Sequence, residues 1–364
     1  MNRFRTERNY RPQRLFIEEG VQHEPFCQRI VEQFAEVPRD FIRDGQELSP
    51  SQQPAGALLL ARQRGPFLRY CPGTSKHICC MYFNLDVAAG CDLGCRYCIL
   101  QGYLNTPTTT IYCNTGDMFC ELDETLIRHP QRFYRIGTGE LSDSMTFDHF
   151  TGLSVDLVQY FSQHQNAIIE LKSKNVHIDN LLGLQHNRRA VVSWSVNAEP
   201  ICQSEEADAP VLSDRLAAAK EIRQAGYRLG FHFDPMIHFP GWEEYYQETV
   251  DRIFSVARPE DIAWISLGAL RYPAAMDDII RENHPDTRMV LGELLPGIDK
   301  KMRYFKSIRI EMFRRMYEWI SGHGFQQGLY LCMESDEVWH KAFGWSPGSS
   351  AGLKHILDDR VRPD

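Results

Sequence analysis

The chain of 364 residues is long enough for one large α/β domain with extensions or for two smaller domains. Its hydrophobic content of 43% and charged content of 24% are typical of a packed globular protein and exclude a disordered or fibrous one. The formal net charge of −8 argues against a protein that coats nucleic acid through a general positive field. We find neither an apolar run of about 18 residues nor a signal segment, so we expect a cytoplasmic protein without membrane contact.

The first eighty residues carry one clear helical pattern. Apolar residues recur at helical spacing over 23–37, and the stretch 49–56 is interpreted as a linker because Pro, Gly and Ser punctuate it. From residue 81 onward the pattern changes, and short β-rich runs alternate with amphipathic helical segments. Six such runs are predicted as strands: 81–88, 133–137, 167–173, 190–197, 228–235 and 262–268.

The segments between these strands, for example 152–165 and 213–226, carry apolar residues three and four positions apart. Strands that alternate with such helices form a parallel sheet covered by helices. The sheet is predicted to be either open and doubly wound or curled into an incomplete barrel, with the functional site in loops at the carboxyl ends of its strands. A last helix over 303–322 and a strand over 328–334 complete the pattern.

Three cysteines crowd together directly after the first predicted strand. The sequence GCDLGCRYCIL places Cys91, Cys95 and Cys98 in a C-x3-C-x2-C pattern. Thiolates are the usual ligands of iron–sulfur clusters, and a tight loop containing Gly90 and Gly94 presents three of them to three corners of a cube. The fourth iron is then left open for an outside ligand, by the same logic that keeps one position of a catalytic zinc open.

A closed zinc site is the alternative interpretation of this motif. It requires a distant fourth ligand, for which Cys113 and Cys120 are the nearest candidates. The total of 11 cysteines is odd, which suits metal binding better than a disulfide framework. The other cysteines are interpreted as buried small hydrophobic residues: Cys27, Cys71, Cys79, Cys80, Cys202 and Cys332.

The pattern C-x3-C-x-aromatic-C after the first of six βα units resembles the radical S-adenosylmethionine superfamily. The resemblance implies an α/β fold with a partial (β/α)6 TIM-type barrel over 81–300, an N-terminal extension over 1–80 and a C-terminal helical extension over 301–364. It also implies a 4Fe–4S cluster whose open iron is chelated by S-adenosylmethionine. One electron from an external donor of the flavodoxin or ferredoxin type then cleaves the sulfonium, and the resulting 5′-deoxyadenosyl radical abstracts hydrogen from a substrate.

Further motifs resemble the spore photoproduct lyase family, whose enzymes reverse a thymine dimer. They follow the family's order along the chain: CRYCILQ, RFYRIGTGELSDSMTFDHFTGL, KNVHIDNLL, SWSVN, AGYRLGFHFDPMIHFPGWEEYY and RYFKSIR. The resemblance extends over 81–320 and is weaker outside that range. It implies a lyase-like enzyme of the DNA-repair type that acts on a nucleic acid or a nucleotide.

Matched position by position, several residues resemble the family's cofactor contacts. Lys174 would pair its ammonium with the methionine carboxylate, and Ser142 and Ser195 would add hydrogen bonds. Glu140 would accept hydrogen bonds from the methionine amine, and Tyr97 would either pack on the adenine or take part in a radical relay. Apart from the resemblance, Lys174 is equally well explained as a surface residue. The two serines are then ordinary residues at strand ends, and Glu140 is a helix-capping carboxylate.

Two positions depart from the family's pattern. The family has a hydrogen-donor cysteine after the second strand, where this chain has Glu140, and no cysteine lies between Cys120 and Cys202. The family also has a tyrosine on each side of the third cluster cysteine, whereas here Tyr97 precedes it and Ile99 follows it. A carboxylate does not donate a hydrogen atom as a thiol does, because its O–H bond is much stronger. The resemblance therefore implies radical formation, but not the family's route of hydrogen return.

Polar residues at the predicted carboxyl ends of later strands are candidates to face the substrate, although satisfied core groups would look the same: His232, Asp234, Arg271 and Tyr272. Basic residues in two segments are candidates for nucleic-acid contact, with a solvated helix face as the alternative: Arg62, Arg64, Arg69, Lys76, Lys300, Lys301, Arg303, Lys306, Arg309, Arg314 and Arg315.

Two other functions stay open on the sequence alone. One is a radical enzyme that acts on a peptide or a small metabolite, which the negative net charge favours slightly. The other is a non-enzymatic protein with a metal site, used for electron transfer or zinc-stabilised binding. That alternative needs a fourth protein ligand and predicts no cleavage of S-adenosylmethionine. The sequence predicts no oligomeric state.

Overall fold

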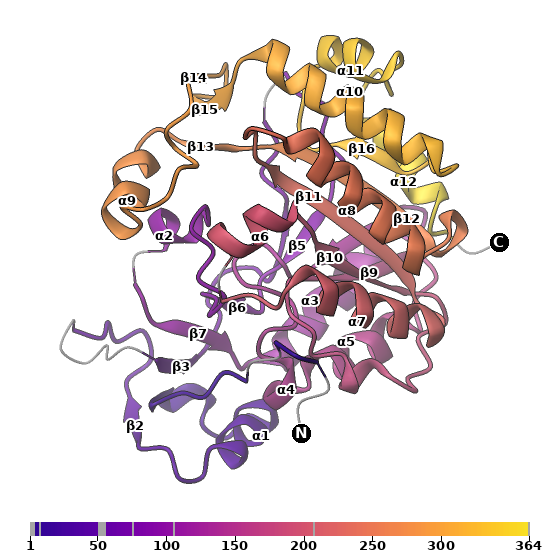
Figure 1. The fold of residues 1–364 in the computed structure, drawn as a ribbon. Helices are drawn as coiled ribbons and strands as arrows, with labels where there is room; N and C mark the ends of the chain where they lie inside the picture. Colours follow the sequence, from indigo (N-terminus) through magenta and orange to yellow (C-terminus); the bar gives the residue numbers. More distant parts are fainter. Residues whose placement is uncertain are drawn as a thin grey trace.

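The computed structural model describes residues 4–6, 9–49, 56–74, 76–104, 106–206 and 208–362. Its centre is an eight-stranded sheet curled into a half-barrel, in the order β16-β12-β11-β10-β9-β8-β5-β4 (Figure 1). The strands are β4 (Leu68–Tyr70), β5 (Phe83–Leu85), β8 (Tyr134–Gly137), β9 (Ala167–Ser173), β10 (Ala190–Ser195), β11 (Arg228–Met236), β12 (Ile262–Ala269) and β16 (Leu329–Leu331). Neighbouring strands of this sheet run parallel, except for β4 and β5.

The predicted partial barrel is confirmed. Its six predicted strands correspond to β5 and to β8 through β12, and the strand predicted over 328–334 is the edge strand β16. Strands β10 and β12 are buried along their whole length, as expected for parallel strands that are covered on both faces. The carboxyl ends of the parallel strands form one end of the half-barrel, which we call the mouth.

Helices cover the outer face of the half-barrel (Figure 1). They include α3 (Thr115–Arg128), α5 (Leu153–Phe161), α7 (Leu212–Gln224), α8 (Trp242–Val256) and α10 (Lys306–Gly322). Helix α5 packs against β9, α7 packs against β10 and β11, and α8 contacts both α7 and α10. The amphipathic patterns at 152–165 and 213–226 therefore belong to helices that bury their apolar faces on the sheet.

Several predicted boundaries differ from the structure. The helix predicted over 23–37 is the shorter α1 (Pro25–Gln33), because the backbone leaves helical angles at Phe34. The helix predicted from residue 303 begins at Lys306, because the preceding residues form β15 (Lys301–Tyr304). The strand predicted over 81–88 divides into β5 and β6 (Ala88–Ala89), which belong to different sheets. Most of the predicted linker over 49–56 lies outside the described residues.

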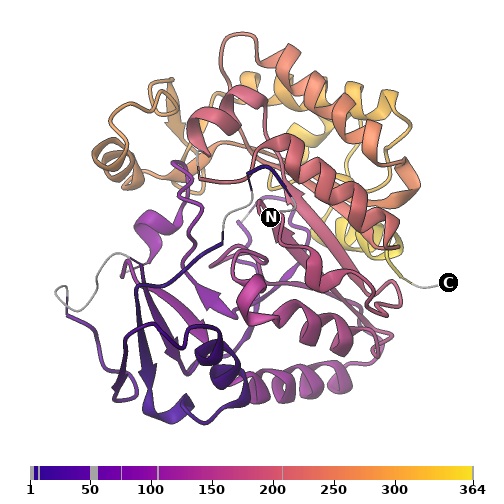
Figure 2. The ribbon, with the colours of Figure 1, turned by 60° about the horizontal axis from the view of Figure 1, so that its bottom comes forward.

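A second sheet, which the sequence did not predict, has the strand order β2-β1-β3-β7-β6. Its other strands are β1 (Arg14–Glu18), β2 (Arg39–Ile42), β3 (Ala57–Ala61) and β7 (Thr109–Tyr112). Because β6 precedes the three motif cysteines and β7 follows them, this sheet anchors the chain on both sides of the motif. Figure 2 shows this N-terminal sheet on one side of the half-barrel and the yellow C-terminal helices on the other.

A small antiparallel sheet follows β12, in the order β13-β15-β14, with β13 at Arg271–Pro273 and β14 at Leu294–Pro296. The remaining helices are α2 (Leu100–Tyr103), α4 (Asp148–Thr151), α6 (Glu199–Glu205), α9 (Met276–Asn283), α11 (Asp336–Phe343) and α12 (Ser350–Asp359). No helix within the described ranges has the length and apolar character that a membrane crossing requires. The division of the chain at residues 80 and 300 stays a prediction.

Candidate active site

The three motif cysteines lie in a loop between β6 and α2, which we call the cluster loop (90–98). Gly90 has a φ of +101°, and a Cβ atom there would lie 3.1 Å from the Thr109 Cα atom. The Gly90 amide donates to the Leu141 carbonyl at 2.9 Å, and the Thr146 hydroxyl donates to Asp92. Leu141 and Thr146 follow β8, so these two contacts hold the cluster loop against the mouth of the half-barrel.

The three thiols pack together with Leu93 and Ala209. Cys95 is buried, and Cys91 and Cys98 are partly buried. Burial raises the pKa of the Cys95 thiol to about 12 and also raises the pKa values of Cys91 and Cys98. Three thiols on one short loop, one buried and two partly buried, are a donor set that fits an iron–sulfur cluster with one open iron.

The cysteines considered as fourth ligands of a zinc site lie elsewhere. Cys113 is buried and shares a hydrogen bond with the Cys27 thiol, while Cys120 is exposed on α3. Among the residues that the structure describes, no three His, Cys, Asp or Glu side chains are arranged to hold a single metal ion. Cys113 thus has a hydrogen-bond partner outside the cluster loop, and the zinc alternative stays a prediction.

Asp143 connects two of the predicted cofactor contacts. Its carboxylate accepts hydrogen bonds from the Ser173 hydroxyl and from the Lys174 backbone amide, both at 2.7 Å. Ser142, which precedes Asp143, is buried after β8, and Lys174 directly follows β9. One carboxylate thus fixes the positions of Ser142 and Lys174 relative to each other.

A buried ion pair brings together three further residues that the sequence analysis singled out. Glu206 and Arg215 form this pair at 2.6 Å, and their side chains are 1% and 0% exposed. Tyr97 donates its hydroxyl to Glu206, and Arg215 donates to the Ser195 carbonyl at 3.0 Å. The Lys174 ammonium lies 5.4 Å from the centre of the Tyr97 ring. Tyr97, Lys174 and Ser195 therefore meet around one pair of charges beside the cluster loop.

Charges in this group shift one another's pKa values. Burial raises the pKa of Glu206, but Arg215 and Lys174 lower it by more, so the net pKa lies below the ordinary value. Burial lowers the pKa of Lys174, but Cys95 and Glu206 raise it by more. Lys174 is therefore positively charged at neutral pH, and it in turn lowers the pKa of the Cys95 thiol. A cation is thus available beside the thiols for an anionic ligand.

The ion pair itself was missed by the sequence analysis. Arg215 lies three residues after Leu212, four before Ala219 and seven before Ile222, and all of these residues are buried on α7. An arginine within the apolar stripe of a helix was the available signal, because arginine is seldom buried without a partner. Glu206 follows the short helix α6 and carries no comparable signal.

Glu140 belongs to a second polar group at the mouth. It follows β8, as predicted, and accepts a hydrogen bond from the Asn84 side-chain amide. Burial and the neighbouring Asp86 raise the pKa of Glu140, whereas Arg69 and Lys172 lower it, and the net pKa is raised. The contact of Glu140 with a methionine amine stays a prediction.

Two of the candidates for substrate contact have partners within the protein. His232 is buried, and its Nε2 atom lies 2.8 Å from Glu170. Tyr272 is also buried and donates its hydroxyl to Asp277 at 3.0 Å. For these two residues, the alternative of satisfied core groups describes the structure.

The other two candidates, Asp234 and Arg271, form a paired group at the mouth. The Arg271 guanidinium donates two hydrogen bonds to the Asp234 carboxylate, at 2.8 and 2.9 Å. Burial raises the pKa of Asp234, but Arg271 lowers it by more, so Asp234 is ionised at neutral pH. Two parallel hydrogen bonds fix the guanidinium plane, so this pair presents polar atoms in a fixed orientation at the mouth.

Most of the basic residues that were candidates for nucleic-acid contact are paired with carboxylates. Ion pairs join Arg62 to Asp117, Arg64 to Glu18, Arg69 to Asp86, Arg303 to Asp299, Lys306 to Glu337, Arg309 to Glu334, and both Arg314 and Arg315 to Glu311. This arrangement agrees with the alternative of ordinary structural and solvated charges. A nucleic acid would compete with these carboxylates for the same cations.

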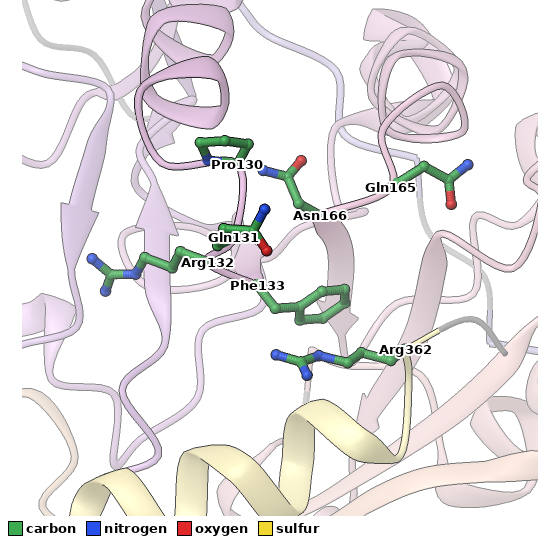
Figure 3. Close-up of a pocket in the computed structure, with 7 residues that line it drawn as sticks. All are labelled: Pro130, Gln131, Arg132, Phe133, Gln165, Asn166 and Arg362. Carbon is green, nitrogen blue, oxygen red and sulfur yellow. The ribbon is translucent and has the colours of Figure 1, made fainter.

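A cavity of about 220 Å³ lies at the opposite end of the half-barrel (Figure 3). It is lined by residues 130–133, Gln165, Asn166 and Arg362. Residues 130–133 immediately precede β8, and Asn166 precedes β9, so the cavity adjoins the amino ends of these strands. Glu140 and Lys174 follow the carboxyl ends of the same two strands. The cavity is therefore separate from the site at the mouth.

Comparison with known proteins gives one consistent result. The family model described as spore photoproduct lyase matches residues 73–312. Spore photoproduct lyase of Bacillus subtilis is 26% identical over 251 residues, which cover 68% of this chain and 71% of that protein. The enzyme of a Geobacillus species is 25% identical over 214 residues, which cover 58% of this chain and 63% of that protein.

Solved structures show the same fold. A spore photoproduct lyase complexed with dinucleoside spore photoproduct has a TM-score of 0.78 and 21% identity, and the match covers 89% of this chain and 99% of that chain. A mutant with bound AdoMet and dinucleoside spore photoproduct gives the same values. The chain therefore belongs to the spore photoproduct lyase family of radical S-adenosylmethionine enzymes, whose cofactors are a 4Fe–4S cluster and S-adenosylmethionine.

Proposed function

We propose that this enzyme binds a 4Fe–4S cluster through Cys91, Cys95 and Cys98 and binds S-adenosylmethionine beside it at the mouth of the half-barrel. The observation that carries the proposal is the convergence of the three thiols of the cluster loop with the Lys174 ammonium and the Tyr97 ring. When bound, the cluster and S-adenosylmethionine supply a 5′-deoxyadenosyl radical for hydrogen abstraction.

The chain's own residues orient this chemistry. The Lys174 ammonium pairs with the carboxylate of the methionine moiety, since a charge-assisted hydrogen bond is strong in a partly buried site. The Ser142 and Ser195 hydroxyls each add a hydrogen bond, and Glu140 accepts one from the methionine amine. Tyr97 presents its ring face to the adenine. An external electron donor of the flavodoxin or ferredoxin type and a cytoplasmic location stay predictions.

We further propose that the substrate is a nucleic acid or a nucleotide that carries a thymine lesion. The relatives' names support this proposal, as does the dinucleoside spore photoproduct held by a solved structure of the same fold. Because most of the basic residues are already paired with carboxylates, we expect the lesion to be held at the mouth and not on a general basic surface.

The first test is anaerobic. The cluster is reconstituted, dithionite and S-adenosylmethionine are added with and without dinucleoside spore photoproduct, and 5′-deoxyadenosine is measured by chromatography. We expect the product from the wild type and a loss to background in Cys95→Ala, together with a lower iron content. Cys120→Ala is the matched control because Cys120 is exposed on α3, and we expect it to behave like the wild type.

Two outcomes count against the proposal. A wild-type protein with a full complement of iron that forms no 5′-deoxyadenosine under either condition contradicts the radical chemistry. Formation of 5′-deoxyadenosine without repair of the dinucleoside, and without salt-sensitive binding of oligonucleotides, contradicts only the substrate. That second result would favour a peptide or a small metabolite.

A further inference from the structure

The cavity at the amino ends of β8 and β9 (Figure 3) is lined by two arginines and three amide side chains, and none of its lining residues is acidic. It lies at the opposite end of the half-barrel from the mouth, so the proposed cofactor site does not include it. Its volume of about 220 Å³ is below the range of about 300–1,000 Å³ that is usual for drug-sized ligands. The cavity therefore suits a small ligand, and the surrounding charges indicate which kind.

Arg132 is held by aromatic rings instead of by a carboxylate. Its guanidinium carbon lies 5.2 Å from the centre of the Tyr70 ring, 4.9 Å from that of Phe83 and 5.1 Å from that of Tyr134. Ring faces attract a cation but do not neutralise its charge. Among the described residues, no ion pair joins Arg132 to a carboxylate, and its side chain is only half-buried. The charge of Arg132 is therefore available to an anion.

Arg362, the second arginine of the lining, shares one carboxylate with two further cations. Asp358 pairs with Arg135 at 2.9 Å and with Lys354, and it lies 3.9 Å from the Arg362 guanidinium. One negative charge thus faces three positive charges. Arg362 also lies 5.5 Å from the centre of the Phe133 ring. Because its contact with Asp358 is the longest of the three, the charge of Arg362 is the least compensated.

Arg189 adds a buried cation beside the cavity. It directly precedes β10 and is 3% exposed, and its Nη2 atom donates to the side-chain oxygen of Gln165, which lines the cavity. Its Nη1 atom is buried and has no hydrogen-bond partner within the described ranges. Burial lowers the pKa of Arg189, and no neighbouring carboxylate raises it. Since arginine is seldom buried without a partner, this unpaired charge favours an anion nearby.

The contact with Arg189 also fixes the orientation of the Gln165 amide. A guanidinium only donates hydrogen bonds, so the oxygen of the amide must be the atom that faces Arg189. The NH2 group of Gln165 has no other partner in the part of the chain that the structure describes. It is therefore free to donate a hydrogen bond to a ligand.

An alternative role for these arginines is to cap the carboxyl ends of α3 and α5, whose carbonyls carry partial negative charge. Amide side chains already do this. The Asn166 amide donates to the Leu126 carbonyl at 3.1 Å, and the Asn187 amide donates to the Ser162 carbonyl at 3.2 Å. The side chains of the two arginines beside Gln165 and the Tyr70 ring donate to no helix carbonyl among the described residues. Helix capping therefore does not account for them.

We infer that this cavity binds a single phosphate group, from inorganic phosphate or from a nucleotide, between Arg132, Arg362 and Gln165. Guanidinium groups bind phosphate oxygens through charge-assisted hydrogen bonds, and a phosphate supplies the negative charge that the lining residues lack. The bound group joins the C-terminal segment to the loop before β8, so its occupancy stabilises the fold. Because the cavity lies away from the mouth, the inference does not rest on the proposed function.

Anaerobic isothermal titration calorimetry of the reconstituted full chain tests the inference. Inorganic phosphate, thymidine 5′-monophosphate and thymidine are the three probes, and sodium chloride holds the ionic strength constant. We expect the two phosphate compounds to bind and thymidine not to bind. Equal affinities of the two identify the phosphate group as the whole ligand, whereas tighter binding of thymidine 5′-monophosphate identifies a nucleotide as the occupant.

Two variants remove the site in different ways. Arg362→Gln removes an exposed cation and should weaken phosphate binding at least about tenfold, through the loss of a charge-assisted hydrogen bond. Gln165→Glu places a carboxylate against Arg189, so the protein should stay folded while the added negative charge abolishes phosphate binding. Arg314→Gln is the matched control, because Arg314 is also exposed but is paired with Glu311 on α10, and it should bind phosphate as the wild type does.

Three results overturn the inference. The first is equal phosphate binding by the wild type and both site variants, which places the anion elsewhere on the protein. The second is the absence of binding at about 10 mM phosphate, where a site of millimolar affinity is mostly occupied. The third is binding of thymidine as tight as that of its monophosphate. Cys95→Ala should bind phosphate as the wild type does, so a failure of the radical chemistry would leave this test intact.

Discussion

Two buried glutamates support two sides of the barrel mouth in different ways: the cofactor side, beside the cluster loop and Lys174, and the substrate side, beside Asp234 and Arg271. On the cofactor side, Glu206 pairs with Arg215 at 2.6 Å, and a guanidinium keeps its charge throughout the pH range in which proteins stay folded. Beneath the substrate side, Glu170 pairs with His232 at 2.8 Å and accepts a hydrogen bond from Trp264 at 2.6 Å. Histidine is the side chain whose charge ordinarily changes near neutral pH.

The first pair contains a permanent cation, whereas the second contains a histidine. S-adenosylmethionine carries fixed charges, and the pair below its proposed site has a permanent cation. The comparison therefore predicts that the two pairs respond differently to mutation and to pH.

Breaking the cofactor-side pair should have the largest effect on stability. Arg215→Met leaves the Glu206 carboxylate buried without its cation, which costs about 3–5 kcal/mol in the free energy of unfolding. Urea denaturation followed by circular dichroism measures this loss. The matched control is the double variant Arg215→Met with Glu206→Gln, which leaves no charge behind and should recover part of the stability. A double variant less stable than Arg215→Met would contradict the role of the pair.

The contribution of the Glu170–His232 pair to the free energy of unfolding should depend on pH. Burial raises the pKa of Glu170, but His232 and the hydrogen bonds around it lower the pKa by more, to about 2. A carboxylate with a lowered folded-state pKa stabilises the protein above its unfolded-state pKa and loses that contribution as pH falls through the folded-state pKa. We therefore expect the stability advantage of wild type over Glu170→Gln to shrink by about 3 kcal/mol between pH 5 and pH 2.

The measurement is urea denaturation at several pH values in the wild type and in Glu170→Gln. Because the lowered pKa belongs to the Glu170 carboxylate, the change with pH should disappear from the difference between the two proteins above about pH 6. A difference that stays constant down to pH 2 would mean that Glu170 is not ionised in the folded protein, and the contrast with Glu206 would then be lost.

The cluster loop could be predicted from the sequence because its three cysteines and two glycines are neighbours in the chain. The half-barrel was predictable for a related reason, since each βα unit is a local pattern that repeats. Strand ends were less accurate because hydrogen bonds between strands decide them, as in the division of residues 81–88 between two sheets. The N-terminal sheet was missed because its short strands pair with distant segments, for example β3 with β7.

The charged groups around the site were the least predictable. Tyr97, Glu206 and Arg215 lie on three separate segments, and only the packed fold brings them together. No spacing rule joins such residues in the sequence. The contact between the two edges of the half-barrel shows the same limit, because only the packed fold brings Ile78, after β4, to Glu334, after β16.

The smallest expected effect concerns two lysines at the carboxyl end of β9. Lys174 on the cofactor side and Lys172 on the substrate side are two residues apart. Lys174→Met should raise the KM for S-adenosylmethionine by roughly tenfold, because it removes one charge-assisted hydrogen bond worth about 1.5 kcal/mol, and Lys174→Arg should recover part of this loss. Lys172→Met is the comparison and should raise this KM by much less, because Lys172 acts on the cofactor only through Glu140. Steady-state formation of 5′-deoxyadenosine measures both. Equal increases in the two variants would mean that the cofactor and the substrate share the whole mouth, and the division into two sides would no longer hold.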